Sequence, residues 1–206
     1  MSFKKLHHLL KDTLEYLEME SPTTFQKLVL PRIKSGANIY GIAPEGAGKT
    51  TALIISTIHI LKAEAFEDAP RALIIVKDKE AALELEEEFR RYLKNTDLRI
   101  FSAYDQPDLD TQKGEIYEGV DIVISTPNKI FRLFKATGIN VTQLKLFAVD
   151  DAEFLSGNKY YNDLVRIPEH ISKCQYLIFS SAMNAKIERF QDSFMAHSEI
   201  VEVLGN

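Results

Sequence analysis

The amino-acid sequence predicts an α/β fold, a doubly wound parallel β-sheet flanked by helices. Short segments that are almost continuously apolar alternate with longer segments whose apolar residues recur at helical spacing. Parallel strands buried on both faces have such apolar sequences, and they need crossover helices to connect them. Residues that carry function are therefore expected in the loops at the carboxyl ends of the strands.

Seven strands and four helices are predicted from these segments. The expected strands are residues 38–43, 72–76, 99–104, 121–126, 144–150, 175–180 and 199–203. The expected helices are residues 49–66, 79–95, 128–136 and 184–196. No repeat, low-complexity tract or glycine- and proline-rich linker divides the chain, so we expect one domain over residues 1–206. Its core spans residues 21–206, and residues 1–20 form a helical extension whose leucines pack on that core.

Composition excludes several classes of protein. Of the 206 residues, 45% are hydrophobic and 27% are charged, and the net charge is -5, so any nucleic-acid contact must be confined to a local patch. Cys174 is the single cysteine, which excludes an internal disulfide and suits a reducing compartment. The longest apolar stretch, residues 52–61, is too short to span a bilayer. With no apolar leader, a cytoplasmic protein without a membrane anchor is expected.

A glycine-rich loop connects the first predicted strand to the next helix. It consists of Ala43, Pro44, Glu45, Gly46, Ala47, Gly48, Lys49 and Thr50, with Thr51 next. The glycines permit backbone conformations whose N–H groups turn inward around phosphates, and the helix dipole points at the same anion. Lys49 is expected to reach the β- and γ-phosphates of a nucleotide, and Thr50 to coordinate Mg²⁺.

A plain glycine turn is the alternative interpretation of this loop. The strand before it and the helix after it favour nucleotide binding. Two residues are unusual: Ala43 stands where the strict motif has a glycine, and Glu45 brings a carboxylate close to the phosphates. Glu45 should weaken ATP binding unless a nearby cation neutralises it.

Two adjacent carboxylates end another apolar strand. Asp150 and Asp151 follow residues 146–149, and Glu153 comes two positions later. A buried unpaired carboxylate lowers the free energy of unfolding, which indicates that these carboxylates are present for a functional reason. Mg²⁺ keeps most of its water and takes one or two carboxylates, so Asp150 can hold it while Asp151 orients or deprotonates the attacking water. Alternatively, both carboxylates only cap a following helix.

Together these motifs resemble the first RecA-like domain of the DEAD-box RNA helicases, whose name comes from the tetrapeptide at residues 150–153 here. Residues 21–33 resemble the Q motif of the family, residues 124–130 its Thr-Pro-Gly-Arg motif, and residues 174–183 the strand carrying Ser-Ala-Thr. The resemblance covers the whole chain. It implies a RecA-like P-loop NTPase fold, ATP and Mg²⁺ as cofactors, RNA as a partner, and an adenine contact from Gln26. Phe3 is a candidate for stacking on the base.

The residues that the resemblance assigns to ATP hydrolysis depart from the family at two points. Asp151 stands in place of the catalytic glutamate and is one methylene shorter, which predicts slow catalysis. Glu153 replaces the last aspartate, so the two carboxylate lengths are exchanged. The coupling motif reads Ser180-Ser181-Ala182 and lacks the threonine hydroxyl that, by the resemblance, helps to couple hydrolysis to strand separation.

The residues that the resemblance assigns to RNA contact depart further from the family. Asp78 places negative charge where the resemblance expects a phosphate to dock, and Asn128 replaces a glycine. Lys79, Thr126 and Lys129 are the candidate RNA contacts, and an ordinary surface role is the alternative for each. A lysine in place of arginine also supplies a point charge instead of a bidentate fork.

Three functions compete on this basis. The first is the ATP-binding domain of a DEAD-box-like ATP-dependent RNA helicase, a hydrolase active only with a second RecA-like domain in the same polypeptide. The second is a degenerate stand-alone module that binds a nucleotide or a protein without helicase activity. The third is a P-loop ATPase unrelated to RNA, which residues 21–33 and 124–130 disfavour.

Overall fold

A parallel sheet lies at the centre of the computed structural model, which describes residues 6–105, 108–156, 160–171 and 173–205. Its strands are β1 (Ile39–Ile42), β2 (Ala72–Ile75), β3 (Ile100–Ala103), β4 (Ile122–Ser125), β5 (Leu146–Val149), β6 (Gln175–Ser180) and β7 (Glu199–Glu202). They pair in the order β3-β4-β2-β5-β6-β1-β7, and every pairing is parallel. The predicted doubly wound sheet and its seven strands are confirmed.

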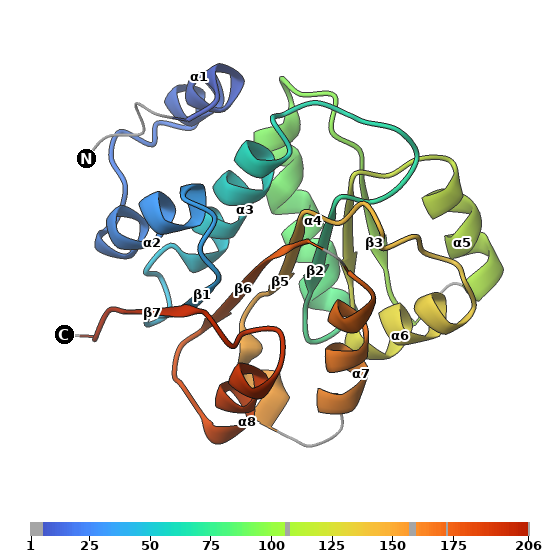
Figure 1. Ribbon diagram of the computed structural model, residues 1–206. Helices are drawn as coiled ribbons and strands as arrows, with labels where there is room; N and C mark the ends of the chain where they lie inside the picture. The colour runs from blue at the N-terminus through green and yellow to red at the C-terminus, as the bar shows by residue number, and fades with distance from the viewer. Residues whose placement is uncertain (1–5, 106–107, 157–159, 172, 206) are drawn as a thin grey trace.

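Helices cover both faces of this sheet (Figure 1). They are α1 (His8–Tyr16), α2 (Thr24–Lys34), α3 (Lys49–Ile60), α4 (Lys79–Leu93), α5 (Leu109–Tyr117), α6 (Pro127–Lys135), α7 (Tyr161–Arg166) and α8 (Ala185–Glu188), with 3-10 helices at Ala152–Ser156, Pro168–His170 and Arg189–Asp192. One apolar core packs α1 to α4 on the sheet, and a second packs α5 to α8 on the other face. Within the described residues, no helix is long and apolar enough to cross a bilayer.

Several helices differ from the predictions. The helix expected over residues 49–66, α3, ends at Ile60, because Lys62 and Ala63 take positive φ angles of 60° and 56°. The helix expected over residues 184–196 is instead the short α8 followed by the 3-10 helix Arg189–Asp192, and the chain leaves helical geometry at Ser193. The predictions also omitted α2, α5 and α7. The expected N-terminal helix is present as α1, in which Leu10 and Leu14 are buried, and Leu6 is buried just before it.

Close aromatic packing fixes α2 against β1, the strand that leads into the glycine-rich loop. The rings of Phe25 and Phe179 meet edge to face with centroids 5.5 Å apart. They do so over Gly41, where a Cβ would lie 2.6 Å from Phe179 Cδ1 and 2.8 Å from Phe25 Cζ. Because any larger residue would separate these elements, Gly41 sets the position of α2 beside the loop.

A buried carboxylate organises the opposite, amino-terminal edge of the sheet. Asp121 is fully buried, and its Oδ1 accepts hydrogen bonds from Arg71 Nη2 at 2.6 Å and from the Phe66 N–H at 3.1 Å. Its Oδ2 accepts a hydrogen bond from Arg99 Nε at 2.9 Å. Arg71 also donates to the Leu61 and Glu64 carbonyls, so this ion network holds the connection from α3 to β2 on the sheet.

Candidate nucleotide-binding site

The glycine-rich loop has the backbone conformation that an anion cradle requires. Gly46 and Gly48 have φ angles of 74° and 87°, in the left-handed region that favours glycine. A Cβ on Gly46 would meet no atom within 4 Å, so open space lies beside the loop at this residue. The Ala43 N–H donates to the Ser180 carbonyl at 3.1 Å, which anchors the start of the loop to β6. A phosphate chain fits this cradle.

The amino-terminal end of α2 holds the loop from one side. Thr23 and Gln26 form a capping box, in which the Gln26 N–H donates to Thr23 Oγ1 and the Thr23 N–H donates to Gln26 Oε1. Thr23 Oγ1 donates to the Ala47 carbonyl at 2.7 Å, and Gln26 Nε2 donates to the Gly48 carbonyl at 3.1 Å. Gln26 is 1% exposed. Its predicted adenine contact stays a prediction, while its role as a clamp on the loop was not expected from the sequence.

Gly48→Ala is expected to destabilise the protein more than Gly46→Ala by about 1 kcal/mol. Both glycines have positive φ, so each substitution carries a backbone cost of about 1–2 kcal/mol. At Gly48 the new Cβ would also lie 2.5 Å from Gln26 Nε2 and displace the clamp, whereas at Gly46 the space is open. Denaturant unfolding of both variants measures the difference. Equal losses would mean that the Gln26 contact contributes nothing to stability.

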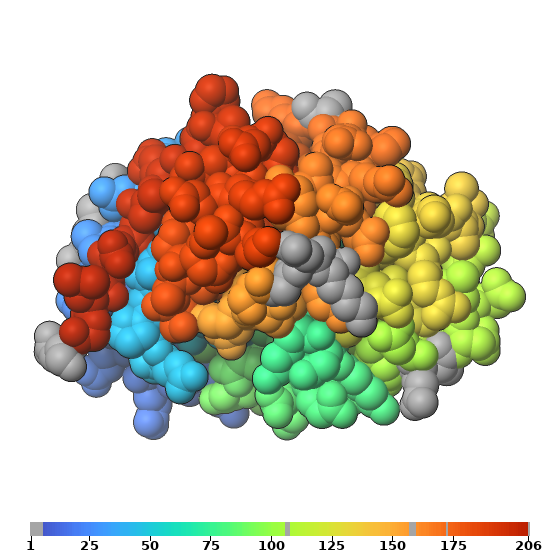
Figure 2. Space-filling view, turned by 90° about the horizontal axis from the view of Figure 1, so that it is seen from below, coloured from blue at the N-terminus to red at the C-terminus, as the bar shows by residue number. Residues whose placement is uncertain are grey.

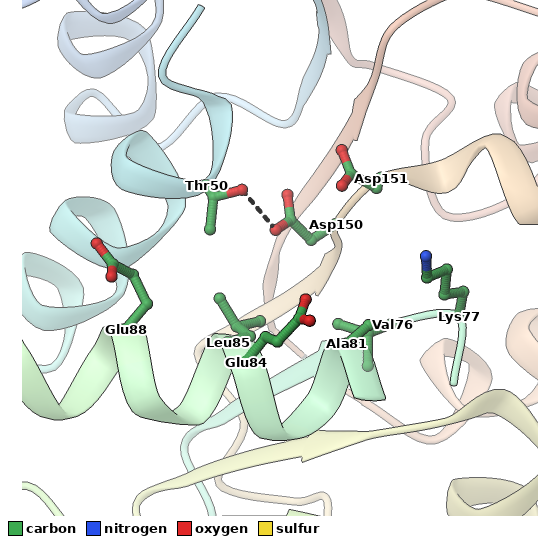
Figure 3. Close-up of a pocket in the computed structure, with 9 residues that line it drawn as sticks. All are labelled: Thr50, Val76, Lys77, Ala81, Glu84, Leu85, Glu88, Asp150 and Asp151. Carbon is green, nitrogen blue, oxygen red and sulfur yellow. Dashed lines mark hydrogen bonds between the residues drawn. The ribbon is translucent and has the colours of Figure 1, made fainter. Parts of the chain in front are cut away.

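Lys49, Thr50 and Asp150 meet where the loop enters α3. Lys49 is 6% exposed, and its Nζ donates to the Ala43 carbonyl at 2.8 Å and to the Pro44 carbonyl at 3.1 Å. Thr50 Oγ1 donates to Asp150 Oδ2 at 3.0 Å (Figure 3). Asp150 Oδ1 is buried and has no hydrogen-bond partner among the described residues. A buried carboxylate oxygen without a partner, beside a threonine hydroxyl, fits the oxygen ligands of Mg²⁺.

Burial and the neighbouring Asp151 carboxyl raise the pKa of Asp150 to about 7, although the hydrogen bond from Thr50 acts to lower it. A cation near Asp150 would favour its ionised form. Partial burial and Glu153 raise the pKa of Asp151, while Lys49 opposes that shift. Asp151 is open to solvent on one side although its carboxyl is partly covered, and its φ of 47° is strained for a residue with a side chain. The two adjacent aspartates therefore differ: one is buried at the loop, and the other faces solvent.

A cavity of about 160 Å³ adjoins this pair of carboxylates. Its lining combines the ends of β2 and β5, the start of α3 and one side of α4 (Figure 3): Thr50, Val76, Lys77, Ala81, Glu84, Leu85, Glu88, Asp150 and Asp151. Sequence motifs did not reveal the α4 residues, because only tertiary packing brings that helix to the loop. In the described part of the chain, no three His, Cys, Asp or Glu side chains form a metal centre by themselves. A metal at Asp150 would therefore need water or phosphate ligands as well.

Comparison with known proteins decides the family. The sequence pattern of the DEAD/DEAH box helicases matches residues 23–190. The chain belongs to this family. Two relatives, the ATP-dependent RNA helicases RhlB of Yersinia pestis (strain Pestoides F) and Yersinia pseudotuberculosis serotype O:1b (strain IP 31758), are each 29% identical to it over 206 residues. These alignments cover 96% of this chain and 48% of the relatives, so the chain spans about half their length.

A solved structure supports the fold. A variant of S. cerevisiae Dbp5, bound to a variant of Gle1 and to IP6, superposes on this chain with a TM-score of 0.86. It is 17% identical, and the match covers 98% of this chain and 52% of Dbp5. The family match and this superposition together confirm the predicted resemblance to the first RecA-like domain of the DEAD-box RNA helicases and the predicted RecA-like fold.

The exchanged carboxylates of the DEAD-box tetrapeptide have a structural consequence. Glu153 reaches the coupling motif and accepts a hydrogen bond from the Ser181 N–H. Burial alone would raise the pKa of Glu153, but hydrogen bonds from Ser181 and Ser180 lower it below its ordinary value. Ser180 Oγ also donates to the Ala182 carbonyl at 2.8 Å. The acidic motif thus contacts the coupling motif through the longer Glu153, although the threonine hydroxyl is missing.

The three candidate RNA contacts lie in different environments. Lys79 is exposed, and its Nζ lies 5.1 Å from the centroid of the Tyr104 ring. Thr126 is buried at the start of α6, and its Oγ1 has no partner in the described part of the chain. Lys129 is 1% exposed and burial lowers its pKa, which excludes the ordinary surface role that the sequence left open. RNA contact by any of the three stays a prediction. Phe3 lies outside the described residues.

Proposed function

We propose that this chain is the ATP-binding domain of an ATP-dependent RNA helicase, which binds MgATP and forms one half of an RNA-binding groove. The observation that carries the proposal is the meeting of Lys49, Thr50 and the unpartnered Asp150 Oδ1 at the glycine-rich cradle. Family membership and the names of the RhlB relatives support the same activity. A second RecA-like domain is proposed as the partner that completes the enzyme.

Each residue of the site would have a defined role. Lys49 would exchange the carbonyls of Ala43 and Pro44 for phosphate oxygens, which it can do because its stem is flexible. Thr50 and Asp150 would hold Mg²⁺, and the ion would neutralise phosphate charge when bound. Asp151 would orient the attacking water from its exposed position, and Glu153 would hold the acidic motif against Ser181.

Calorimetric titration of MgATP and MgADP into the chain tests this proposal. Saturable binding of both nucleotides is expected, and RNA-stimulated hydrolysis should appear once a second RecA-like domain is supplied. Absence of binding in folded protein, with and without that second domain, would contradict the proposal. It would favour the alternative of a protein-interaction module that keeps the fold without the nucleotide.

Asp151→Glu is expected to raise RNA-stimulated ATP hydrolysis of the two-domain form by about tenfold or more. The longer side chain would carry the carboxylate closer to the water, and a misplacement of about 1 Å costs much of the rate. Steady-state hydrolysis at saturating RNA measures the effect. Asp151→Asn is the matched control, because it keeps the length and removes the charge, and it should lose activity. No gain in Asp151→Glu at unchanged nucleotide affinity would mean that side-chain length does not limit the rate.

A further inference from the structure

The cavity that adjoins the glycine-rich loop is rich in carboxylates. Its lining includes Glu84 and Glu88 on α4, and Asp150 and Asp151 after β5, whereas Lys77 is the only basic residue among the described residues that line it. Seen from below, the segment after β5, the segment that leads into α4 and the glycine-rich loop adjoin one another (Figure 2, light orange, green and light blue). A phosphate chain at the loop would therefore lie beside concentrated negative charge.

The two glutamates of α4 differ in how their charges are compensated. Glu88 Oε2 accepts a hydrogen bond from Arg91 Nη1 at 2.7 Å, so a guanidinium neutralises this carboxylate. The carboxylate of Glu84 forms no ion pair or hydrogen bond within the part of the chain that the structure describes. Figure 3 shows the Glu84 side chain rising from α4 toward Asp150. Glu84 therefore contributes an uncompensated charge on the α4 side of the cavity.

An independent observation on the opposite side of the cavity indicates a cation. Asp150 is 6% exposed, and its Oδ1 has no hydrogen-bond partner among the described residues, whereas Oδ2 accepts one from Thr50. A buried carboxylate oxygen without a donor is satisfied by a cation or by the water that a cation holds. The cavity volume of about 160 Å³ leaves room for such an ion with several of its waters. Glu84 would then face the ion from α4.

We propose that Glu84 is a specificity-determining residue that makes nucleotide binding at the glycine-rich loop depend on a divalent cation. The inference rests on the proposed function, because it concerns the same nucleotide site. A metal-free nucleotide would bring its full negative charge beside the Glu84 carboxylate and would be repelled. A cation-bound nucleotide carries less negative charge, and a carboxylate is a suitable acceptor for hydrogen bonds from the waters of the cation. Glu84 thus disfavours the first form of the nucleotide and tolerates the second.

Glu84→Gln keeps the shape of the side chain and removes its charge. Calorimetric titration of ATP in excess Mg²⁺ and in excess EDTA gives two dissociation constants, and their ratio measures the dependence on the cation. We expect the variant to bind metal-free ATP about two- to fivefold tighter than wild type, the size of one solvent-screened charge interaction. Its affinity for MgATP should change by less than about twofold, because the cation already neutralises phosphate charge. The ratio should therefore fall in the variant.

Glu87→Gln is the control for net charge. Glu87 is exposed on the same helix and does not line the cavity, so its ratio of dissociation constants should equal that of wild type. Equal tightening in both variants, no tightening of metal-free ATP in Glu84→Gln, or equal tightening of ATP and MgATP in that variant would each overturn the inference. The proposed function is tested separately on the wild-type protein, where failure to bind MgATP would contradict it whatever the variants do.

Discussion

Lys49→Ala is expected to weaken MgATP binding by about a hundredfold or more. Lys49 is 6% exposed and is held at the loop by the Ala43 and Pro44 carbonyls, so only a movement of its flexible stem is needed to bring its ammonium to phosphate oxygens. Hydrogen bonds to a charged group contribute about 1.5–3 kcal/mol each, and two of them to phosphate oxygens account for a hundredfold. Calorimetric titration of MgATP measures the loss.

Lys27→Ala is the matched control for this substitution. Lys27 is exposed on α2, next to the Gln26 that clamps the loop, and its removal takes away the same charge. Its MgATP affinity should change by less than about threefold, as expected for a screened surface charge. Binding that survives in Lys49→Ala would mean that the glycine-rich loop does not hold the phosphates. Equal loss in both variants would indicate a general effect of charge.

Asp121→Ala is expected to lower the free energy of unfolding by about 3–5 kcal/mol. The substitution leaves Arg71, whose side chain is 4% exposed, without its buried counter-ion, and it also releases Arg99 and the Phe66 N–H. An uncompensated buried charge costs more than the ion pair contributes, which explains the size of the effect. Small domains are stable by about 5–15 kcal/mol, so the variant should be close to unfolding at physiological temperature.

Denaturant unfolding measures this loss, and Asp110→Ala is its control. Asp110 has a side chain that is 92% exposed and lies 3.8 Å from Lys113, so its removal should cost less than about 1 kcal/mol. Similar losses in the two variants would contradict a special role for the buried network at Asp121.

The stability that Asp121 provides should depend on pH in a defined direction. Burial alone would raise its pKa, but hydrogen bonds from Arg99 and Arg71 lower it below the ordinary value of 3.8. A carboxyl whose pKa is lowered by folding stabilises the protein above its unfolded pKa. That contribution is lost as the pH falls from about 4 through the lower folded pKa, so the difference between wild type and Asp121→Ala should shrink only on the acid side.

The sheet and the glycine-rich loop could be predicted because their signals are local. A parallel strand buried on both faces is apolar throughout, as in residues 146–149, and the loop conformation depends on Gly46 and Gly48 themselves. The capping box of Thr23 and Gln26 was an available signal for α2. By contrast, α5 is largely polar and α7 has six residues, so neither carries a strong apolar period.

The sequence by itself determined the parallel sheet, the position of the loop between β1 and α3, and the carboxylates that follow β5. Only the tertiary structure decided which side chains meet across long separations: Thr50 with Asp150, Gln26 with Gly48, and Glu153 with Ser181. It also decided that Lys129 is buried. The physical reason is that backbone conformation depends on near neighbours, whereas the partner of a side chain depends on how helices pack on the sheet, which no short segment encodes.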